Sequence, residues 1–391
     1  MARVQMRVGF LLNHYAPHQV PHVAPYAFAL SLARPGWQVS LLCSSRAEEA
    51  FCAEIAALYP GHECRIERLH VPLHARLIDP LVRKVAFYRK LAVQKANIAR
   101  FASLDALVVP EMTSLSLRED ARTAGLKLIF TGHGAGDGYH QAVGMFDPRI
   151  DQFDLALLPG IRIAEELLKL GRFANARYAI TGYPKFELSG ITPDKPLFAN
   201  DKPTVLFNPT QNRKATCWHK FGVDVLDFFY DSPDYNLIFA PHVLLFQRSW
   251  SRGARLPSRY RSTDRVLIDT GSRASVDMTY LKAADLYLGD LSSQIYEFIN
   301  QPRPCVFLDP FGVEYQGDPA YRSWSFGPVV RDVADLPGAL QAALSGFEEY
   351  RAIQTEARDR NFAQSETPAS RRGAMAIAEF LETGDISDQW H

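Results

Sequence analysis

The sequence has little of what marks secreted, metal-binding or membrane-spanning proteins. Its 391 residues include only 5 cysteines, an odd number without CxxC spacing, so neither a disulfide framework nor a zinc site is indicated. No apolar run approaches the roughly 18 residues that span a bilayer, and the N-terminus lacks a signal-peptide pattern. We therefore expect a cytoplasmic protein.

An excess of charge of either sign is also absent. The 43 Lys and Arg side chains balance 43 Asp and Glu side chains, whereas nucleic-acid-binding proteins are usually basic. We therefore expect no nucleic-acid partner. No suitable loop carries the clustered acidic residues of a DxD metal site, so we expect neither a metal nor another cofactor.

What is present is an alternation of apolar strands and helical runs. Strand patterns occur at residues 6–12, 37–42, 64–69, 106–109, 126–130, 155–158 and 178–181, and then at 204–208, 236–240, 266–269, 286–289 and 304–308. Helical patterns lie between them, including 46–59, 79–101, 116–124 and 161–170, which predicts βαβ units and parallel sheets.

The length favours two domains, and the polar, proline-containing segment 188–202 is typical of a linker. We predict an α/β protein with two Rossmann-like domains, each a doubly wound parallel sheet, which face a cleft. The first domain would span residues 1–190 and the second residues 191–368. Residues 369–391 would form a C-terminal helix, which often crosses back to the first domain in twin-domain folds.

One predicted helix is strongly basic. From Arg76 to Arg100 the chain carries seven Lys or Arg residues against the single acidic residue Asp79, interleaved with apolar residues. A basic amphipathic helix can bind anionic lipid or an anionic acceptor, which would make this a peripheral membrane contact on the inner face of the cell membrane. The alternative is an ordinary solvated basic face.

Four loops follow predicted strands, where open α/β sheets bind their ligands. In the first, TGHGAGDGYH at 131–140, glycines such as Gly134 allow close approach to a ligand, and His133 is either a general base or a hydrogen-bonded turn residue. The second, at 208–214, offers Thr210 and Arg213 to a phosphate. The third ends in His242.

The fourth loop lies within DLYLGDLSSQIYEF at 285–298, which predicts a strand, a tight turn and a helix. Its polar residues Asp290, Ser292, Ser293 and Glu297 surround the start of the helix, where unpaired N–H groups favour anions such as a pyrophosphate. The alternative is that a serine merely caps the helix. In parallel sheets all four loops would lie at one rim.

The order GHG, TGYPK, VLFNPT, FAPH and LKAADLYLGDLSSQIYEF, over about residues 126–308, resembles the CDP-glycerol glycerophosphotransferase family of teichoic acid and capsule polymer synthesis. The resemblance implies a GT-B fold, in which the first domain (1–190) would bind the acceptor and the second (191–368) the nucleotide donor. It implies His133 as base on the acceptor hydroxyl. It also implies that His242, Thr210, Ser292 and Ser293 lie around the donor phosphates, and Asp290 matches the aspartate that precedes the serines.

We therefore expect a transferase that moves a glycerophosphate or sugar unit from a CDP-linked donor to a glycan or lipid-linked acceptor. Three alternatives remain. The chain could be a GT-B glycosyltransferase that uses a CMP- or UDP-sugar, an isomerase like the nucleotide-sugar 2-epimerases, or a non-catalytic nucleotide-binding protein.

Overall fold

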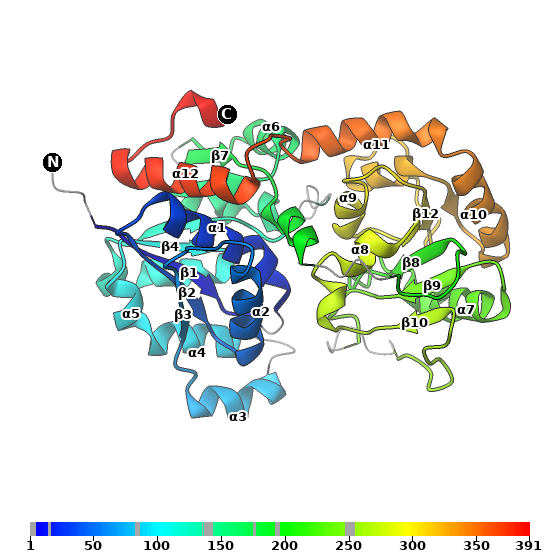
Figure 1. Ribbon diagram of the computed structural model, residues 1–391, viewed down its shortest axis with the longest axis horizontal. Helices are drawn as coiled ribbons and strands as arrows, with labels where there is room; N and C mark the ends of the chain where they lie inside the picture. Colours follow the sequence, from blue (N-terminus) through cyan, green and yellow to red (C-terminus); the bar gives the residue numbers. More distant parts are fainter. Residues whose placement is uncertain are drawn as a thin grey trace. The chain divides into compact units, whose positions relative to one another are not determined.

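The computed structural model describes residues 5–14, 17–82, 87–134, 136, 144–174, 177–191, 196–246 and 255–391. The chain divides into two compact units (Figure 1). Unit 1 contains Met1–Gly134, Gln141–Ile191 and Arg360–His391, and unit 2 contains Ala135–His140 and Thr192–Asp359. The predicted domain bounds, 1–190 and 191–368 with a C-terminal helix at 369–391, stay a prediction.

Unit 1 is built on a parallel sheet of seven strands in the order β3-β2-β1-β4-β5-β6-β7. Their bounds are Arg7–Leu12 (β1), Gln38–Cys43 (β2), Arg65–Arg68 (β3), Ala106–Val109 (β4), Lys127–Phe130 (β5), Leu155–Leu158 (β6) and Arg177–Ile180 (β7). The strand order reverses between β1 and β4. This switch point is where doubly wound sheets bind ligands, at the carboxyl ends of the strands.

Helices flank this sheet. They are Val20–Ala33 (α1), Arg46–Ala56 (α2), Leu73–Val82 (α3), Tyr88–Ala96 (α4), Ile98–Ala102 (α5), Ile161–Lys169 (α6) and Ala369–Thr383 (α12), with short 3-10 turns that include Pro17–Gln19 (η1), Met112–Glu119 (η2), Ala121–Thr123 (η3) and Pro184–Gly190 (η7).

The C-terminal helix α12 packs against α1 within unit 1 (Figure 1). A Cβ atom on Gly373 would come within 2.1 Å of the Tyr26 ring, so this close approach requires glycine. At the other end of the contact, Arg34 donates to Glu382 over 2.6 Å.

Unit 2 contains a parallel sheet of six strands in the order β10-β9-β8-β11-β12-β13. The strands are Thr204–Asn208 (β8), Asn236–Phe239 (β9), Val266–Ile268 (β10), Leu286–Gly289 (β11), Cys305–Leu308 (β12) and Val329–Val330 (β13). The helices are Trp218–Asp231 (α7), Thr279–Ala283 (α8), Gln294–Phe298 (α9), Leu336–Ser345 (α10) and Glu348–Asn361 (α11). The switch point lies between β8 and β11.

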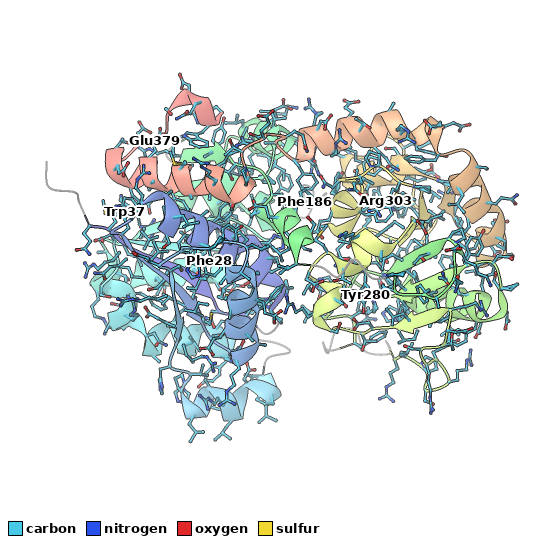
Figure 2. All side chains as sticks on the ribbon, viewed as in Figure 1. Phe28, Trp37, Phe186, Tyr280, Arg303 and Glu379 are labelled. Atoms are coloured by element: carbon cyan, nitrogen blue, oxygen red, sulfur yellow. The ribbon has the colours of Figure 1, made fainter. Side chains whose placement is uncertain are left out.

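The core of unit 2 combines aliphatic and aromatic side chains, and polar contacts join α11 to the same unit. Trp218 stacks on Phe239 with ring centroids 5.2 Å apart. Arg303, labelled in Figure 2, lies with its guanidinium 3.9 Å from the Phe298 ring centroid. The buried Gln354 side chain accepts from the Arg303 backbone N–H at 3.0 Å and so ties α11 to this unit.

The predicted fold class is confirmed, with two corrections among the elements. The single basic helix at 79–101 is wrong: α3 ends at Val82, and α4 begins only at Tyr88 and ends before Asn97, where α5 starts. Residues 116–124 form the 3-10 turns η2 and η3 rather than an α-helix. Strand β13 was not predicted, because two residues are too short for a pattern. No helix in the described ranges is long and apolar enough to cross a membrane.

Candidate active site

In unit 1, loops after β1, β4 and β5 converge at the switch point. Asn13 follows β1, Glu111 follows β4, and His133 follows β5. The strands are parallel throughout, so their carboxyl ends share one edge of the sheet. Gly132 has φ +63°, and a Cβ there would come within 2.2 Å of Met145 Sδ, which explains the glycine just before the histidine. Gly134, just after it, is half-buried.

The tautomer of His133 follows from its hydrogen bond. Its Nδ1 lies 2.9 Å from the Pro110 carbonyl oxygen, and because a carbonyl only accepts, Nδ1 carries the proton. In the neutral ring the lone pair is then on Nε2. Burial lowers the pKa of His133, while the Pro110 hydrogen bond and Glu111 raise it and Lys90 lowers it. The ring is therefore held as a neutral base.

A buried ion pair lies beside this histidine. Lys90 Nζ contacts Glu111 Oε2, with side-chain exposures of 2% and 12%. Gln19 Nε2 is 3.4 Å from the same Glu111 oxygen and 3.5 Å from His133 Nδ1, so Gln19 touches both groups.

Further basic groups surround His133. The His18 ring centroid lies 5.6 Å from that of His133. Burial lowers the pKa of His22 well below its usual value, with added repulsion from Lys185, His133 and His18. Lys185 itself is only 4% exposed. Unit 1 thus gathers imidazoles and buried lysines at one edge.

Glu48 holds the loops that frame this edge. Its carboxylate accepts from the backbone N–H of His14 at 3.0 Å and of Ser44 at 2.8 Å, which follow β1 and β2. Burial raises the pKa of Glu48 to about 7 despite these bonds. Arg89 donates to the Ser44 carbonyl oxygen at 2.9 Å, so it also points inward rather than into solvent.

In unit 2 the switch point is organised by Asp290. Its carboxylate is fully buried and accepts from the backbone N–H of Thr210 at 2.9 Å and of Cys217 at 2.8 Å. Burial raises the pKa of Asp290 to about 6, although the same N–H groups oppose the rise. The side chain therefore fastens the 208–217 loop to the end of β11.

The serine pair lies where the sequence predicts strand, turn and helix, although the helix is short. Ser292 Oγ accepts from the Gln294 N–H at 3.3 Å in the turn before α9, whose N-cap residue is Ser293. Ser293 is approached by the backbone of Gly136, where a Cβ would lie 3.0 Å from Ser293 Cα. Because α9 has five residues, its dipole is small, and the serine hydroxyls and loop N–H groups supply most of the anion-binding capacity.

His242 shows the opposite tautomer to His133. The Leu244 backbone N–H lies 3.2 Å from His242 Nδ1 and donates to it, so in the neutral ring the proton is on Nε2. The backbone N–H of His242 donates to the Pro209 carbonyl at 2.9 Å, which joins this loop to the one that follows β8. A ring held in this way is a hydrogen-bond donor.

The other predicted residues of unit 2 differ in exposure. Thr210 is 8% exposed and Glu297 is 3% exposed, whereas Arg213 is exposed. Arg213 can thus reach an anion in solvent, and Glu297 is packed inside. No group of His, Cys, Asp and Glu in the described part of the chain could hold a metal ion.

Sequence reasoning missed Glu111, Lys90 and Gln19. The position of Glu111 could have indicated a site residue. It comes two residues after β4, at the carboxyl edge of the sheet, where the other candidate site residues also lie. Lys90 carried no such signal, because a basic residue in an amphipathic pattern is expected on the surface. Residues 83–86, with Arg83 and Lys84 of the predicted basic helix, lie outside the described residues.

The comparisons with known proteins show the family of the chain and its fold. The model of the CDP-glycerol:poly(glycerophosphate) glycerophosphotransferase family matches residues 183–379, about half of the chain. The chain belongs to this family. As a glycerophosphotransferase-family member it is a transferase, and the predicted resemblance is confirmed. The matched segment includes His242, Asp290 and the serine pair, and His133 precedes it. No curated protein sequence matches the chain.

Solved structures with the same architecture confirm the predicted GT-B fold of this family member. The wall teichoic acid polymerase TagF is 13% identical, with 97% of this chain and 90% of that chain covered and a TM-score of 0.63. The co-structure of MnaA from S. aureus with UDP is 12% identical, with 97% and 96% covered and a TM-score of 0.61. A UDP-N-acetylglucosamine 2-epimerase, also 12% identical with 97% and 96% covered, has a TM-score of 0.56.

Proposed function

We propose that the protein transfers a glycerophosphate unit from CDP-glycerol to a hydroxyl of a glycan or lipid-linked acceptor in the synthesis of a cell-surface polymer such as teichoic acid or capsule. The observation that carries this proposal is the family match over 183–379. The acceptor oxygen attacks the phosphorus that bears glycerol, a new P–O bond forms, the pyrophosphate bond breaks, and CMP leaves.

His133 is the base of this reaction. The Pro110 carbonyl holds its proton on Nδ1, so Nε2 takes the proton of the acceptor hydroxyl as the new bond forms. A neutral imidazole is needed for this step, and burial favours the neutral ring. Gly134 lets the backbone pass close to the acceptor.

The residues of unit 2 hold the donor. His242, with its proton on Nε2, donates to the departing CMP phosphate, which is an oxyanion-type role. Thr210, Ser292 and Ser293 supply further donors, and Arg213 supplies a cation. Asp290, whose carboxylate is bonded to backbone N–H groups, acts by positioning the loop that carries Thr210. Glu297 is buried in α9, the helix that follows the serine pair, and supports that helix from inside.

Ligand binding tests this assignment first. We expect CDP and CDP-glycerol to raise the melting temperature of the purified protein more than CMP, UDP or GDP, because a ligand that binds only the folded state stabilises it. CMP release from CDP-glycerol with an added poly(glycerophosphate) acceptor then measures the reaction. The absence of any nucleotide effect would favour a non-catalytic protein and overturn the proposal.

A nucleotide-sugar reaction is the second candidate, because MnaA, solved with UDP, shares the fold. An epimerase would act on a UDP-sugar without an acceptor, and a glycosyltransferase would use a CMP- or UDP-sugar with one. Stabilisation by UDP above CDP, followed by isomerisation of a UDP-sugar in the absence of acceptor, would select the epimerase.

We further propose that α3 makes the membrane contact. Leu73, Leu77 and Leu81 lie on one face of this helix and are 69%, 66% and 80% exposed. Arg76 is exposed whereas Asp79 is buried, so the exposed charge of α3 is basic and suits an anionic lipid surface. Arg89, Lys90 and Arg100, in contrast, bind groups of unit 1.

Sedimentation with vesicles tests the contact. Vesicles that contain an anionic lipid should bind the protein, neutral vesicles should bind it less, and Leu77→Gln with Leu81→Gln should abolish binding. Leu168→Gln is the matched control, since Leu168 is a leucine of unit 1 that is 47% exposed on α6. Equal binding by the α3 variant and the control would refute the proposal.

A further inference from the structure

The ion pair between Lys90 and Glu111 occupies the switch point of unit 1. Asn13, which follows β1, donates from Nδ2 to the Lys90 carbonyl oxygen at 3.0 Å. Thr113 Oγ1 donates to Glu111 Oε1 at 2.8 Å, and Lys90 Nζ holds the other oxygen. Glu111 is thus fixed on both oxygens, and the preceding residue is Pro110, whose carbonyl orients His133.

Holding a loop in place with a buried ion pair has a large cost in desolvation free energy. Removing two ions from water costs several kcal/mol each, and packed apolar side chains of similar size often serve as well or better. The side chain of Lys90 is 2% exposed, and the loop already has other bonds through Thr113. The cost of burying the two charges is explained if they affect the protonation of a neighbouring group. The titratable group beside them is His133.

The charges around His133 oppose one another. Glu111 favours the imidazolium form and Lys90 disfavours it. The remaining titratable groups that face the ring are His18 of η1, His22 of α1 and, beyond His22, Lys185 of η7. Since these are neutral or basic, Glu111 is the acidic group of this described cluster, and Lys90 balances it.

We propose that Lys90 and Glu111 are positioning residues for the base: together they fix the Pro110 carbonyl that selects the His133 tautomer and cancel each other's charge at the ring. This inference rests on the proposed function of His133. Neither residue touches the reacting atoms. The Lys90–Glu111 pair affects the reaction through His133, and the Gln19 side chain lies between Glu111 and the His133 ring.

The proposal predicts shifts of opposite sign from two isosteric variants. In Glu111→Gln the uncompensated Lys90 lowers the pKa of His133 further, so the acidic limb of the pH–rate profile moves to lower pH. In Lys90→Met the uncompensated Glu111 raises the pKa of His133, so that limb moves to higher pH and kcat at neutral pH falls by about tenfold or more. The double variant Lys90→Met with Glu111→Gln restores the wild-type position.

The pKa of His133 is measured directly by NMR titration of histidine-labelled protein, with His133→Asn to assign the resonance. This readout needs no substrate. Glu166→Gln is the control, because the Arg162–Glu166 pair of the same unit is similarly buried, at 6% and 12% exposure. If one single variant does not fold, the double variant and the other single variant still give the sign of the effect.

Shifts in the same direction, or none beyond that of Glu166→Gln, would reduce the pair to a structural role and overturn the inference. Failure of the proposed function would look different. In that case His133→Asn would leave CMP release unchanged, whatever the titration shows.

Discussion

Each of the two sheets places a carboxyl group at its switch point, and the two groups are used differently. In unit 2, Asp290 is fully buried and accepts two backbone N–H groups. In unit 1, Glu111 pairs with the ammonium group of Lys90 beside a histidine. A carboxylate that accepts from N–H groups fixes the shape of a loop, whereas one that pairs with a cation also affects the charge beside the His133 ring.

The histidines at the carboxyl edges of the two sheets also differ, in the ring nitrogen that carries the proton. His133 donates from Nδ1 to a carbonyl and keeps a lone pair on Nε2, and His242 accepts at Nδ1 and keeps a proton on Nε2. One ring is prepared to take a proton and the other to donate a hydrogen bond. Under the proposed function, the backbone group that meets Nδ1 decides which of the two rings acts as a base and which as a hydrogen-bond donor.

The largest effect should come from removing the base. His133→Asn is expected to lower kcat for CMP release by 10²–10⁴, the usual contribution of a general base, with the CDP-induced melting shift unchanged. His242→Ala should lower kcat by roughly 10²–10³, as loss of an oxyanion donor does, and should also reduce that melting shift. Identical loss of binding in both variants would contradict the separate roles.

Next in size is the loop anchor of unit 2. Asp290→Asn replaces one acceptor oxygen by an NH2 group that faces a backbone N–H, so the free energy of unfolding should fall by about 1–3 kcal/mol in urea titration. Asp285→Asn is the control, since Asp285 also accepts a backbone N–H, from Thr204 at 2.8 Å, but is exposed. An equal loss in both variants would show that burial of Asp290 is irrelevant.

The free energy of unfolding should depend on pH through the buried carboxyl groups of both units. The pKa of Asp290 is raised to about 6 and that of Glu48 to about 7, above their usual values of 3.8 and 4.5. The folded state therefore holds protons that the unfolded state has lost, and these groups reduce stability as pH rises from about 4 to about 7.

Glu48→Gln should flatten this fall by about 3 kcal/mol across the interval, because a rise of the pKa from 4.5 to about 7 corresponds to that amount at roughly 1.4 kcal/mol per pKa unit. Unfolding in urea at pH 4.5, 6 and 7.5 measures it. A steeper fall in the variant than in the wild type would contradict the sign.

The smallest effect distinguishes the two serines. Ser292→Ala should lower the free energy of unfolding by about 1 kcal/mol, because Ser292 Oγ accepts from the Gln294 N–H in the turn before α9. Ser293→Ala should leave the free energy of unfolding within about 0.5 kcal/mol, as changes without a lost contact usually do, and should weaken CDP binding if its hydroxyl meets phosphate. Equal unfolding costs, with equal CDP affinity, would assign both residues to the local structure of the turn alone.

The sequence predicted the sheets well because buried parallel strands are short apolar runs with polar ends. The runs at Ala106–Val109 and Leu155–Leu158 coincide with β4 and β6. The prediction of a single basic helix with an exposed charged face was wrong for a physical reason. A pattern of charged residues in the sequence does not show which of them form ion pairs in the fold. Lys90 and Arg100 looked like surface residues, yet they bind Glu111 and Glu67.

The candidate site was predicted in its loops but not in its contacts. Asp290 was expected beside the phosphates, and its burial against Thr210 and Cys217 depends on how the 208–217 loop folds back over β11. Glu111 was overlooked because a lone glutamate has no motif. Such roles arise from tertiary packing, which brings together residues more than seventy positions apart.

The measurement that tests the central claim most directly is the 15N NMR spectrum of protein labelled in its histidine rings, with His133→Asn and His242→Gln to assign the two residues. We predict that neutral His133 carries its proton on Nδ1 and neutral His242 on Nε2. The same tautomer at both positions, or a proton on Nε2 of His133, would contradict the division of the two rings into base and donor.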